Sequence, residues 1–482
     1  MELQHLGAVE LARRIARGEL ASRALLELYL DRISRFNPRL NAVVHLRAES
    51  ARDRADEADR AQRRGEHWGP LHGLPITIKE CFDWAGSPST FGRLERREHR
   101  ATEDAVAVNR LVQAGAIVFG KTNVPVDLAD WQSFNPVYGA TANPWDLSRS
   151  PGGSSGGAAA ALAAGLTALE LGSDLSGSIR MPSHFCGVYG HKPSFGIVPV
   201  RGHAISPGLP ADDLNVVGPL ARSAEDLERA LRLMTGADAP RSRAWRLGLP
   251  EPDRVHLKDY RLALKTDDEH FPVDRDTYRT ALQVADVLRE AGASVTLDPP
   301  LPMASGDYYR LHLALARGST ASRRTAAEID ALQAEARATQ PDDLGYQALM
   351  VRGLTQSHRE WLERNTERER LREGWDRFFR AYDVLIAPVS PTPAPPHMHD
   401  VPKRDHQVMV DGLPRAMADT YFWIGLASIA YLPATTIPAG QSDAGLPIGL
   451  QIIGPEYADL RCIALARALE QAHRGFRPPP GY

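Results

Sequence analysis

Apolar residues at helical spacing run through the first 65 residues and predict helices there. The clearest stripe is formed by Leu25, Leu26, Tyr29, Leu30 and Ile33. We expect Asn37-Pro38 to end this helix, because proline has no amide hydrogen to continue the ladder. Residues 48–64 predict a second, highly charged helix on the surface.

A short apolar strand is predicted at residues 76–78, after the Gly-Pro breaks at 69–70 and 73–75. Lys79 follows directly at the end of this strand. A lysine at the exit of an apolar strand is unusual, although a solvated surface lysine is the ordinary alternative.

Residues 115–122 match the phosphate-binding pattern G-x-x-x-x-G-K-[ST]. We reject that function, because the four residues between the glycines are typical of a buried strand rather than an exposed phosphate cradle. Pro125 also stands where the required helix should be under way. The segment therefore predicts a core strand that ends in a Gly-Lys turn.

The rest of the chain alternates helices and strands. Residues 223–234 predict an amphipathic helix, and residues 235–253 are the best linker candidate. Residues 262–264, 275–291 and 295–297 predict a β-α-β unit. Later predictions are a helical region at 303–381 with a Ser357–Glu360 capping box, strands at 384–386, 432–438 and 448–453, an extended loop at 388–396 and a helix at 460–472.

Two glycine-serine turns occur in the stretch from 151 to 192, at residues 152–157 and 176–178. An alanine-rich helix and a short apolar strand are predicted between them. Glycine lets backbone N–H groups approach a ligand closely, and the serines supply hydroxyls on the same turns. These are the parts of a nucleophile with an oxyanion pocket. Residues 187–219, rich in glycine and proline, predict further strands and active-site loops.

Composition narrows the choice of partners and of compartment. The formal net charge of −3 gives no reason to expect nucleic acid or an anionic membrane. Three isolated cysteines, Cys81, Cys186 and Cys462, fit a reducing compartment without disulfides or a zinc site. No long apolar run and no signal-peptide pattern is found, so the cytoplasm is the expected location.

Lys79, Ser154 and Ser178 together resemble the Ser–Ser–Lys constellation of the amidase signature family. Residues 151–157 (PGGSSGG) and 172–180 (GSDLSGSIR) carry the resemblance, with segments at 73–79, 120–123, 143–146, 190–193 and 445–455. The similarity covers nearly the whole chain. It implies an α/β fold with a central mixed sheet covered by helices on both faces. It also implies one domain over 1–482, with N-terminal helices (1–65), a signature core (66–235) and remaining strands and substrate-side helices (254–482).

The resemblance assigns roles to these residues. By this resemblance, Ser178 is expected to be the nucleophile and Lys79 the general base. Ser154 is expected to be the proton bridge and to follow a cis peptide bond at Gly153–Ser154. The backbone amides of Leu175, Ser176, Gly177 and Ser178 form the oxyanion hole, next to a helix that begins near Ile179. Ser155, Asp174 and Arg180 support the loop. The family usually has glycine where this chain has Ser176, so a positive φ there would strain the serine and reshape the pocket.

A lysine can act as a base only when it is neutral. Burial disfavours its charge and lowers its pKa, and a pKa near 7–8 requires a dry site. The density of glycine and small residues around the two turns makes such a site physically reasonable. This argument favours a functional Lys79 over a surface lysine.

The predicted activity is hydrolysis of a carboxylic amide, or of an ester, through an acyl-enzyme, with no cofactor and no metal. Contacts with the small substrate are expected from residues 130–134, from near Ile179 and from residues 303–421. One alternative is the amidotransferase branch, in which the chain serves an acyl-tRNA partner in a multi-subunit complex, and another is a catalytically weakened binding protein. A homodimer is an open possibility. A Ser-His-Asp triad using His184 or His191, or a Cys186 nucleophile, would leave Lys79 without a role.

Overall fold

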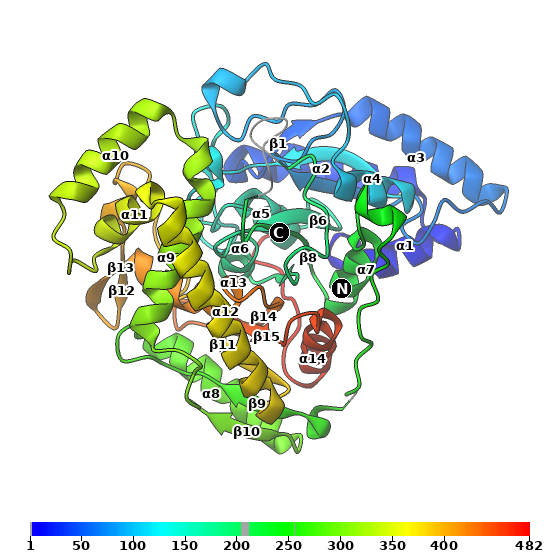
Figure 1. The fold of residues 1–482 in the computed structure, drawn as a ribbon. Helices are drawn as coiled ribbons and strands as arrows, with labels where there is room; N and C mark the ends of the chain where they lie inside the picture. The colour runs from blue at the N-terminus through cyan, green and yellow to red at the C-terminus, as the bar shows by residue number, and fades with distance from the viewer. Residues whose placement is uncertain (1, 204–211, 255) are drawn as a thin grey trace.

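One mixed β-sheet organises the part of the chain that the computed structural model describes, residues 2–203, 212–254 and 256–482. Its eleven strands follow the order β1-β3-β2-β6-β8-β7-β14-β15-β11-β9-β10 (Figure 1). Their bounds are β1 (Val43–Leu46), β2 (Pro75–Lys79), β3 (Ile117–Thr122), β6 (Glu170–Asp174), β7 (Tyr189–Lys192), β8 (Val216–Ala221), β9 (Arg261–Leu264), β10 (Ser294–Leu297), β11 (Val384–Pro388), β14 (Ala434–Gln441) and β15 (Pro447–Ile453). The neighbours of β2, namely β3 and β6, run parallel to it.

Helices cover both faces of this sheet. Along β9 and β11 alternate residues enter two different cores: Leu262, Leu264 and Ile386 lie in the larger core, and Ala263 and Leu385 lie in the second. This alternation follows from the two-residue period of a strand. The predicted mixed-sheet α/β fold with helices on both faces is confirmed.

Different helices pack into the two cores. The larger core receives apolar side chains from α1 (Ala8–Ala16), α2 (Ser22–Leu40), α3 (Ala48–Arg63), α4 (Val106–Gln113), α5 (Gly156–Ala163), α7 (Ala224–Met234), α8 (Arg275–Glu290) and α14 (Asp459–Ala472). The second core receives them from α9 (Ser305–Thr320), α11 (Tyr346–Thr355), α12 (His358–Ala381) and α13 (Thr420–Ser428). The short helix α6 (Arg180–Cys186) contributes to both. In Figure 1 α9, α10 (Ala326–Ala338) and α11 lie on the side of the molecule opposite α1 and α3.

Small hairpins complete the described elements: β4 (Phe134–Asn135) pairs with β5 (Gly139–Ala140), and β12 (Gln407–Val410) pairs with β13 (Leu413–Ala416). The β-α-β unit is confirmed as β9, α8 and β10, and the capping box at Ser357 and Glu360 begins α12 as predicted. The candidate linker at 235–253 contains one short 3-10 helix, Arg241–Arg243. Part of the predicted loop region 187–219, residues 204–211, lies outside the described residues.

The predicted end of the second helix at Asn37-Pro38 is wrong, because α2 continues through Pro38 to Leu40. Proline in the last turn removes only one amide donor, so little of the helical ladder is lost. Asn41 then adopts a left-handed conformation with φ of 49°, and its amide donates to the carbonyl of Asn37 at 2.7 Å. The Asn37 side chain accepts from the amides of Ala42 and Val43 and closes the turn.

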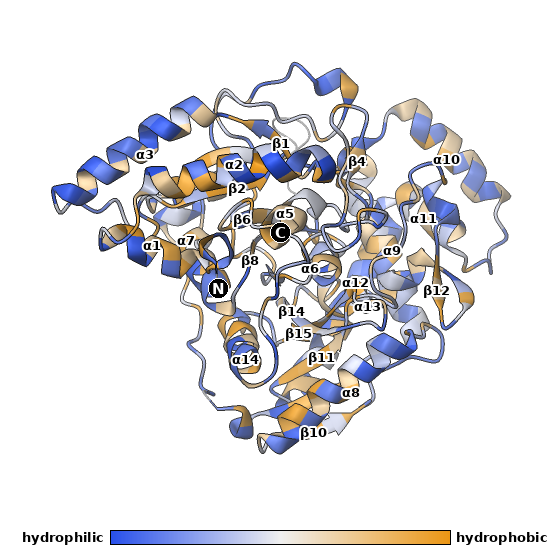
Figure 2. Cartoon of the chain, turned by 180° about the vertical axis from the view of Figure 1, so that it is seen from behind, coloured by the Kyte–Doolittle hydropathy of each residue, from blue (hydrophilic) through white to orange (hydrophobic). Residues whose placement is uncertain are grey.

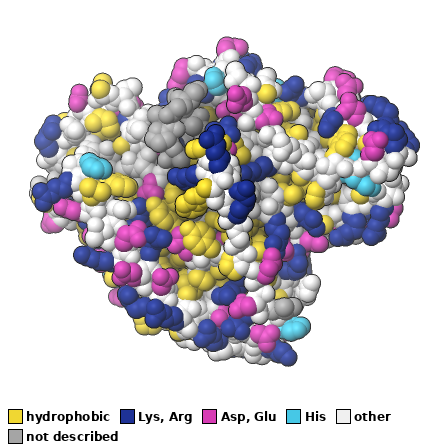
Figure 3. Space-filling model, turned by 45° about the vertical axis from the view of Figure 1, so that its right-hand side comes forward, with side chains coloured by type: hydrophobic (Ala, Val, Ile, Leu, Met, Phe, Trp, Pro, Cys, Tyr) yellow, Lys and Arg dark blue, Asp and Glu magenta, His cyan; other side chains and the backbone are white. Residues whose placement is uncertain are grey.

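Charged side chains are prominent on the surface. Figure 2 shows α3 as mostly hydrophilic, with apolar residues on one side, which confirms the predicted charged surface helix. On the face drawn in Figure 3, basic and acidic side chains are interspersed. Within the described ranges, no helix combines the length and apolar character needed to cross a bilayer.

Candidate active site

Lys79 lies at the end of β2, a strand whose five residues are all buried between β3 and β6. Its side chain is fully buried, and Nζ lies 2.6 Å from Ser154 Oγ and 3.0 Å from Ser173 Oγ. Burial lowers the pKa of Lys79 to about 8. The amine is therefore partly neutral near physiological pH, and the interpretation of Lys79 as a surface lysine is excluded.

Two further lysines, Lys121 and Lys192, are buried, and burial lowers their pKa values to about 8 and about 7. Their surroundings differ from those of Lys79. Lys121 Nζ donates to the carbonyls of Glu80 and Phe82, among others, and Lys192 Nζ to those of Pro193 and Leu432. These two amines donate mainly to backbone carbonyls, with the Ser89 hydroxyl as a further partner of Lys121, whereas Lys79 donates to two serine hydroxyls.

The first glycine-serine turn packs closely against its neighbours. A cis peptide bond joins Gly153 to Ser154, as the family resemblance implied. Gly152 has a φ of +84°, and a Cβ there would lie 2.6 Å from Cα of Pro182. A Cβ at Gly153 would lie 2.3 Å from the carbonyl oxygen of Asp130. Glycine is required at both positions, and α5 begins directly after the turn, at Gly156.

The second turn is braced by a buried ion pair between Asp174 and Arg180, both fully buried. Asp174 Oδ1 accepts from the amide of Gly177 at 2.8 Å, and Oδ2 accepts from that of Ile179 at 3.1 Å. Burial alone would raise the pKa of Asp174, but the Arg180 guanidinium lowers it to about 2. Arg180 donates further to Ile424 O, Gln451 Oε1 and Ser428 Oγ, which anchors the turn to α13 and β15.

The two turns lie side by side. The amide of Ser155 donates to the carbonyl of Ser178 at 3.1 Å. Ser178 lies two residues before the start of α6 and is 9% exposed. Ser154 and Ser178 both line one cavity, so the structure brings Lys79, Ser154 and Ser178 into a single region.

Ser176 is not strained. The left-handed φ of +90° belongs to its neighbour Gly177, and Ser176 is not among the residues with positive φ. Its hydroxyl donates to His312 Nε2 at 3.0 Å, since His312 Nδ1 donates its hydrogen to the carbonyl of Tyr421 at 2.7 Å. Burial lowers the pKa of His312 to about 4, which keeps the ring neutral. The Ser176 carbonyl also accepts from Trp131 Nε1 at 2.8 Å.

Replacing Ser176 with alanine is expected to lower the free energy of unfolding by about 1–3 kcal/mol, because the buried Nε2 of His312 loses its donor. Ser176→Gly is expected to cost at least as much, since the position does not need a positive φ. Urea denaturation of the three proteins measures both effects. A glycine variant more stable than wild type would show that serine is strained here.

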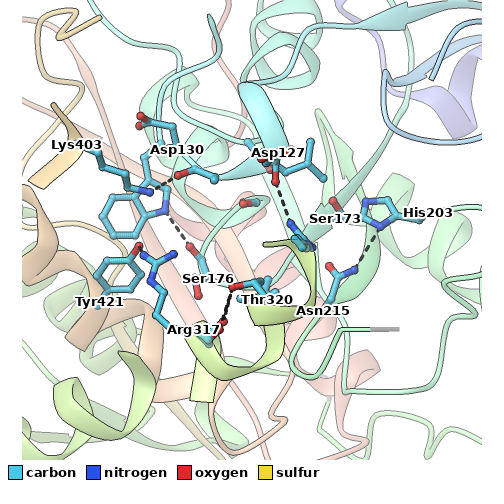
Figure 4. A pocket seen from close by; sticks show the side chains of 18 of the residues that line it. Asp127, Asp130, Ser173, Ser176, His203, Asn215, Arg317, Thr320, Lys403 and Tyr421 are labelled. Atoms are coloured by element: carbon cyan, nitrogen blue, oxygen red, sulfur yellow. Dashed lines mark hydrogen bonds between the residues drawn. The ribbon is translucent and has the colours of Figure 1, made fainter. Parts of the chain in front are cut away.

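A cavity lies beside the two turns, and Figure 4 shows the side chains that line it. Its volume is about 80 Å³. Its wall comes from the first turn, the second turn, α9, α13 and the segment from Asp127 to Trp131. Lining residues outside the predicted catalytic set are Asp127, Leu128, Ala129, Asp130, Trp131, Ser173, His203, Asn215, Ala316, Arg317, Thr320, Arg323, Arg324, Lys403 and Tyr421. Most fall in the regions expected to contact substrate, 130–134 and 303–421, but no local sequence signal singled out Arg317, His312 or Lys403.

The other nucleophile candidates lie away from this cavity. Cys186 is fully buried, its Sγ donates to the carbonyl of Pro151 at 3.4 Å, and burial raises the pKa of its thiol. His184 Nδ1 accepts from the amide of Gly449 at 2.6 Å. His191 contacts Asp459 and Thr435. These contacts are structural and offer no alternative catalytic set.

Comparison with known proteins identifies the family of this chain. The family described as Amidase matches residues 24–463. The indoleacetamide hydrolase of Bradyrhizobium diazoefficiens is 31% identical over 97% of this chain and 87% of its own length. A glutamyl-tRNA(Gln) amidotransferase subunit of Natranaerobius thermophilus is 30% identical over 100% of this chain and 98% of its own. A bacterial aryl acylamidase structure superimposes with a TM-score of 0.82 at 26% identity, covering 99% of both chains.

The fold and these matches define an amidohydrolase. The chain belongs to the amidase signature family.

Proposed function

We propose that this protein hydrolyses a small, non-peptide or peptide-like carboxylic amide through an acyl-enzyme on Ser178. Ser154 is the proton bridge and Lys79 the general base. The observation that carries the proposal is the buried contact of 2.6 Å between Lys79 Nζ and Ser154 Oγ beside the cavity that Ser178 lines. The lowered pKa of Lys79, about 8, makes the neutral amine available as a base.

In the first half of the reaction, neutral Lys79 takes the proton of Ser154 as Ser154 takes that of Ser178. Ser178 Oγ then bonds to the amide carbon, and the carbonyl oxygen becomes an oxyanion. The amides of Leu175, Ser176 and Ser178 have no acceptor in the described part of the chain, which leaves them available to the oxyanion. The amide of Gly177, the fourth predicted donor, already donates to Asp174 Oδ1, so it would have to divide its hydrogen bond between Asp174 and the oxyanion.

In the second half, the proton returns through Ser154 to the leaving nitrogen as the C–N bond breaks. Ammonia or an amine departs, and the acyl group stays on Ser178. Water then attacks the ester with the same proton bridge, which releases the carboxylic acid and restores Ser178. Asp174 and Arg180 stabilise the second turn and take no part in the proton transfer, because their charged groups pair with each other and hydrogen-bond to the backbone.

The amidotransferase hypothesis has independent support, since a glutamyl-tRNA(Gln) amidotransferase component is among the relatives. A chain of this kind would pass ammonia to a partner. The binding-protein hypothesis rested on a strained Ser176, and that residue has no positive φ and is held by His312. The single-domain organisation, the cytoplasmic location and a homodimer stay predictions.

A panel of acyl amides, anilides and the matching esters tests the proposal with the purified chain alone. We expect release of ammonia or amine from at least one amide class, at a rate proportional to protein concentration and without an added cofactor. Turnover that appears only with an acyl-tRNA and further protein components would favour the amidotransferase. No turnover in either setting would contradict amide hydrolysis.

A further inference from the structure

Four cationic side chains outside the catalytic set line the cavity, and they differ in their partners. Arg323 is ion-paired with Asp212, and Arg324 lies 3.5 Å from Glu328. Arg317 and Lys403 have no carboxylate within 4.0 Å among the described residues. The residues outside those ranges, Met1, 204–211 and Val255, include no Asp or Glu that could supply one.

Arg317 projects from the last turn of α9 toward Tyr421, beside Ser176 and Thr320 (Figure 4). Its Nη2 donates to the hydroxyls of Tyr421 at 2.5 Å and Tyr346 at 3.0 Å. Its Nε is buried and has no acceptor within the described ranges. A guanidinium carries five N–H donors, so Arg317 has N–H groups left that can donate to a ligand. Two phenols orient the cation. Burial alone would raise the pKa of Tyr421, but the charges of Arg317 and Lys403 lower it.

Lys403 lines the same cavity. Its Nζ donates to the carbonyl of Ala129 and lies 5.8 Å from the centre of the Trp131 ring. Two carboxylates also line the cavity. Asp127 is ion-paired with Arg93, whereas Asp130 accepts from the amide of Gln132 and forms no ion pair with Arg317 or Lys403 in the described part of the chain. Among the described lining residues, Asp130 is therefore the one carboxylate without an ion-pair partner, and it stands against two cations, Arg317 and Lys403.

A partly desolvated cation without a counter-ion is costly, and a bound anion relieves that cost. Planar carboxylates fit the guanidinium fork with two parallel hydrogen bonds. The cavity also contains Ser178, so a ligand held at Arg317 sits in the same space as the proposed nucleophile.

We propose that the amide substrate is an anion, whose carboxylate binds Arg317 with Lys403 beside it while its amide carbon faces Ser178. This inference rests on the proposed function and adds the substrate class to it. An uncharged aromatic amide would leave Arg317 without a counter-ion.

Matched pairs of small amides test this substrate class. Succinamate and glutaramate place the carboxylate on the acyl side and are compared with butyramide and valeramide; N-butyrylglycine places it on the amine side and is compared with N-propylbutyramide. We expect kcat/KM for the charged member of at least one pair to be about 100-fold higher than for its neutral partner. The pair that shows the preference identifies which side carries the charge.

Arg317→Met is expected to lower kcat/KM about 100-fold more for the preferred anionic amide than for its neutral partner. Lys403→Met is expected to lower it about tenfold, and Arg317→Lys to restore part of the loss. Arg310→Met is the matched control, because Arg310 lies on the same helix but pairs with Asp307 and Glu367 away from the cavity. It should match wild type on both substrates.

A competition assay on wild type keeps the test independent of how well the variants fold. Succinate or glutarate should slow labelling of Ser178 by a fluorophosphonate, whereas succinamide should not. Equal turnover of charged and neutral amides, with labelling unaffected by either acid, would overturn the anionic substrate and leave amide hydrolysis intact. Failure to hydrolyse any amide, with no labelling of Ser178, would overturn the proposed function itself.

Discussion

Ser178→Ala is expected to lower kcat for amide hydrolysis by about 10⁴–10⁶-fold, because the variant lacks the hydroxyl that we propose as nucleophile. The backbone amides of the second turn remain in place in this variant, so substrate binding should change little. Steady-state assays of ammonia release, extended by single-turnover measurements at high protein concentration, can measure a decrease in kcat of this size.

Ser183→Ala is the matched control for Ser178→Ala. Ser183 is a buried serine on α6, five residues further along the chain, and its hydroxyl donates to the carbonyl of Ile179 at 2.8 Å. It does not line the cavity, and its variant should retain activity within a few-fold of wild type. Retention of more than one-hundredth of wild-type activity by Ser178→Ala would remove this residue as nucleophile.

Lys79→Ala and Lys79→Met are expected to lower kcat/KM by about 10³–10⁵-fold, since the proton of Ser178 then has no acceptor beyond Ser154. The same role predicts that kcat/KM of the wild-type enzyme increases with pH. Burial lowers the pKa of Lys79 to about 8, so the amine is protonated and inactive below that pH and neutral above it. Log kcat/KM should rise with unit slope toward pH 8 and level off above it.

The pH profile separates a catalytic lysine from a structural one. If Lys79 only held Ser154 and Ser173 in place, its charged form would serve as well, and activity would be flat or would fall as the amine loses its proton. A profile that falls between pH 7 and pH 9 would therefore contradict the neutral-lysine base. In the methionine variant, the rise near pH 8 should be absent from any residual activity.

Local sequence patterns predict much of the fold. The β2 strand, the β9–α8–β10 unit and the capping box at Ser357 depend on neighbours within a few residues, and all were predictable. Pro38 was misjudged because the cost of proline depends on its place in a helix, and one lost donor in the last turn is small. The closing contacts of Asn37 and Asn41 depend on backbone geometry that the residue types alone do not specify.

The candidate site was predictable only where it follows a motif. Lys79, Ser154 and Ser178 were identified from family-like segments, although 75 residues separate the lysine from Ser154. Ser176 was expected to be strained, but its partner His312 lies 136 residues further along the chain. Arg317 could not be singled out either, because an arginine near the end of a helix is ordinary in sequence. Its significance comes from Tyr346, Tyr421 and a lack of carboxylates within reach in the described structure.

The most direct test of the central claim is to locate the acyl-enzyme. Wild-type protein reacted with a fluorophosphonate, or quenched during turnover of an activated amide or ester, is digested and the modified peptide is sequenced by mass spectrometry. We predict a single adduct on Ser178, which is absent in Ser178→Ala and formed far more slowly in Lys79→Ala. An adduct on Ser154, Ser176 or Cys186, or an active protein that never carries an adduct, would contradict the account.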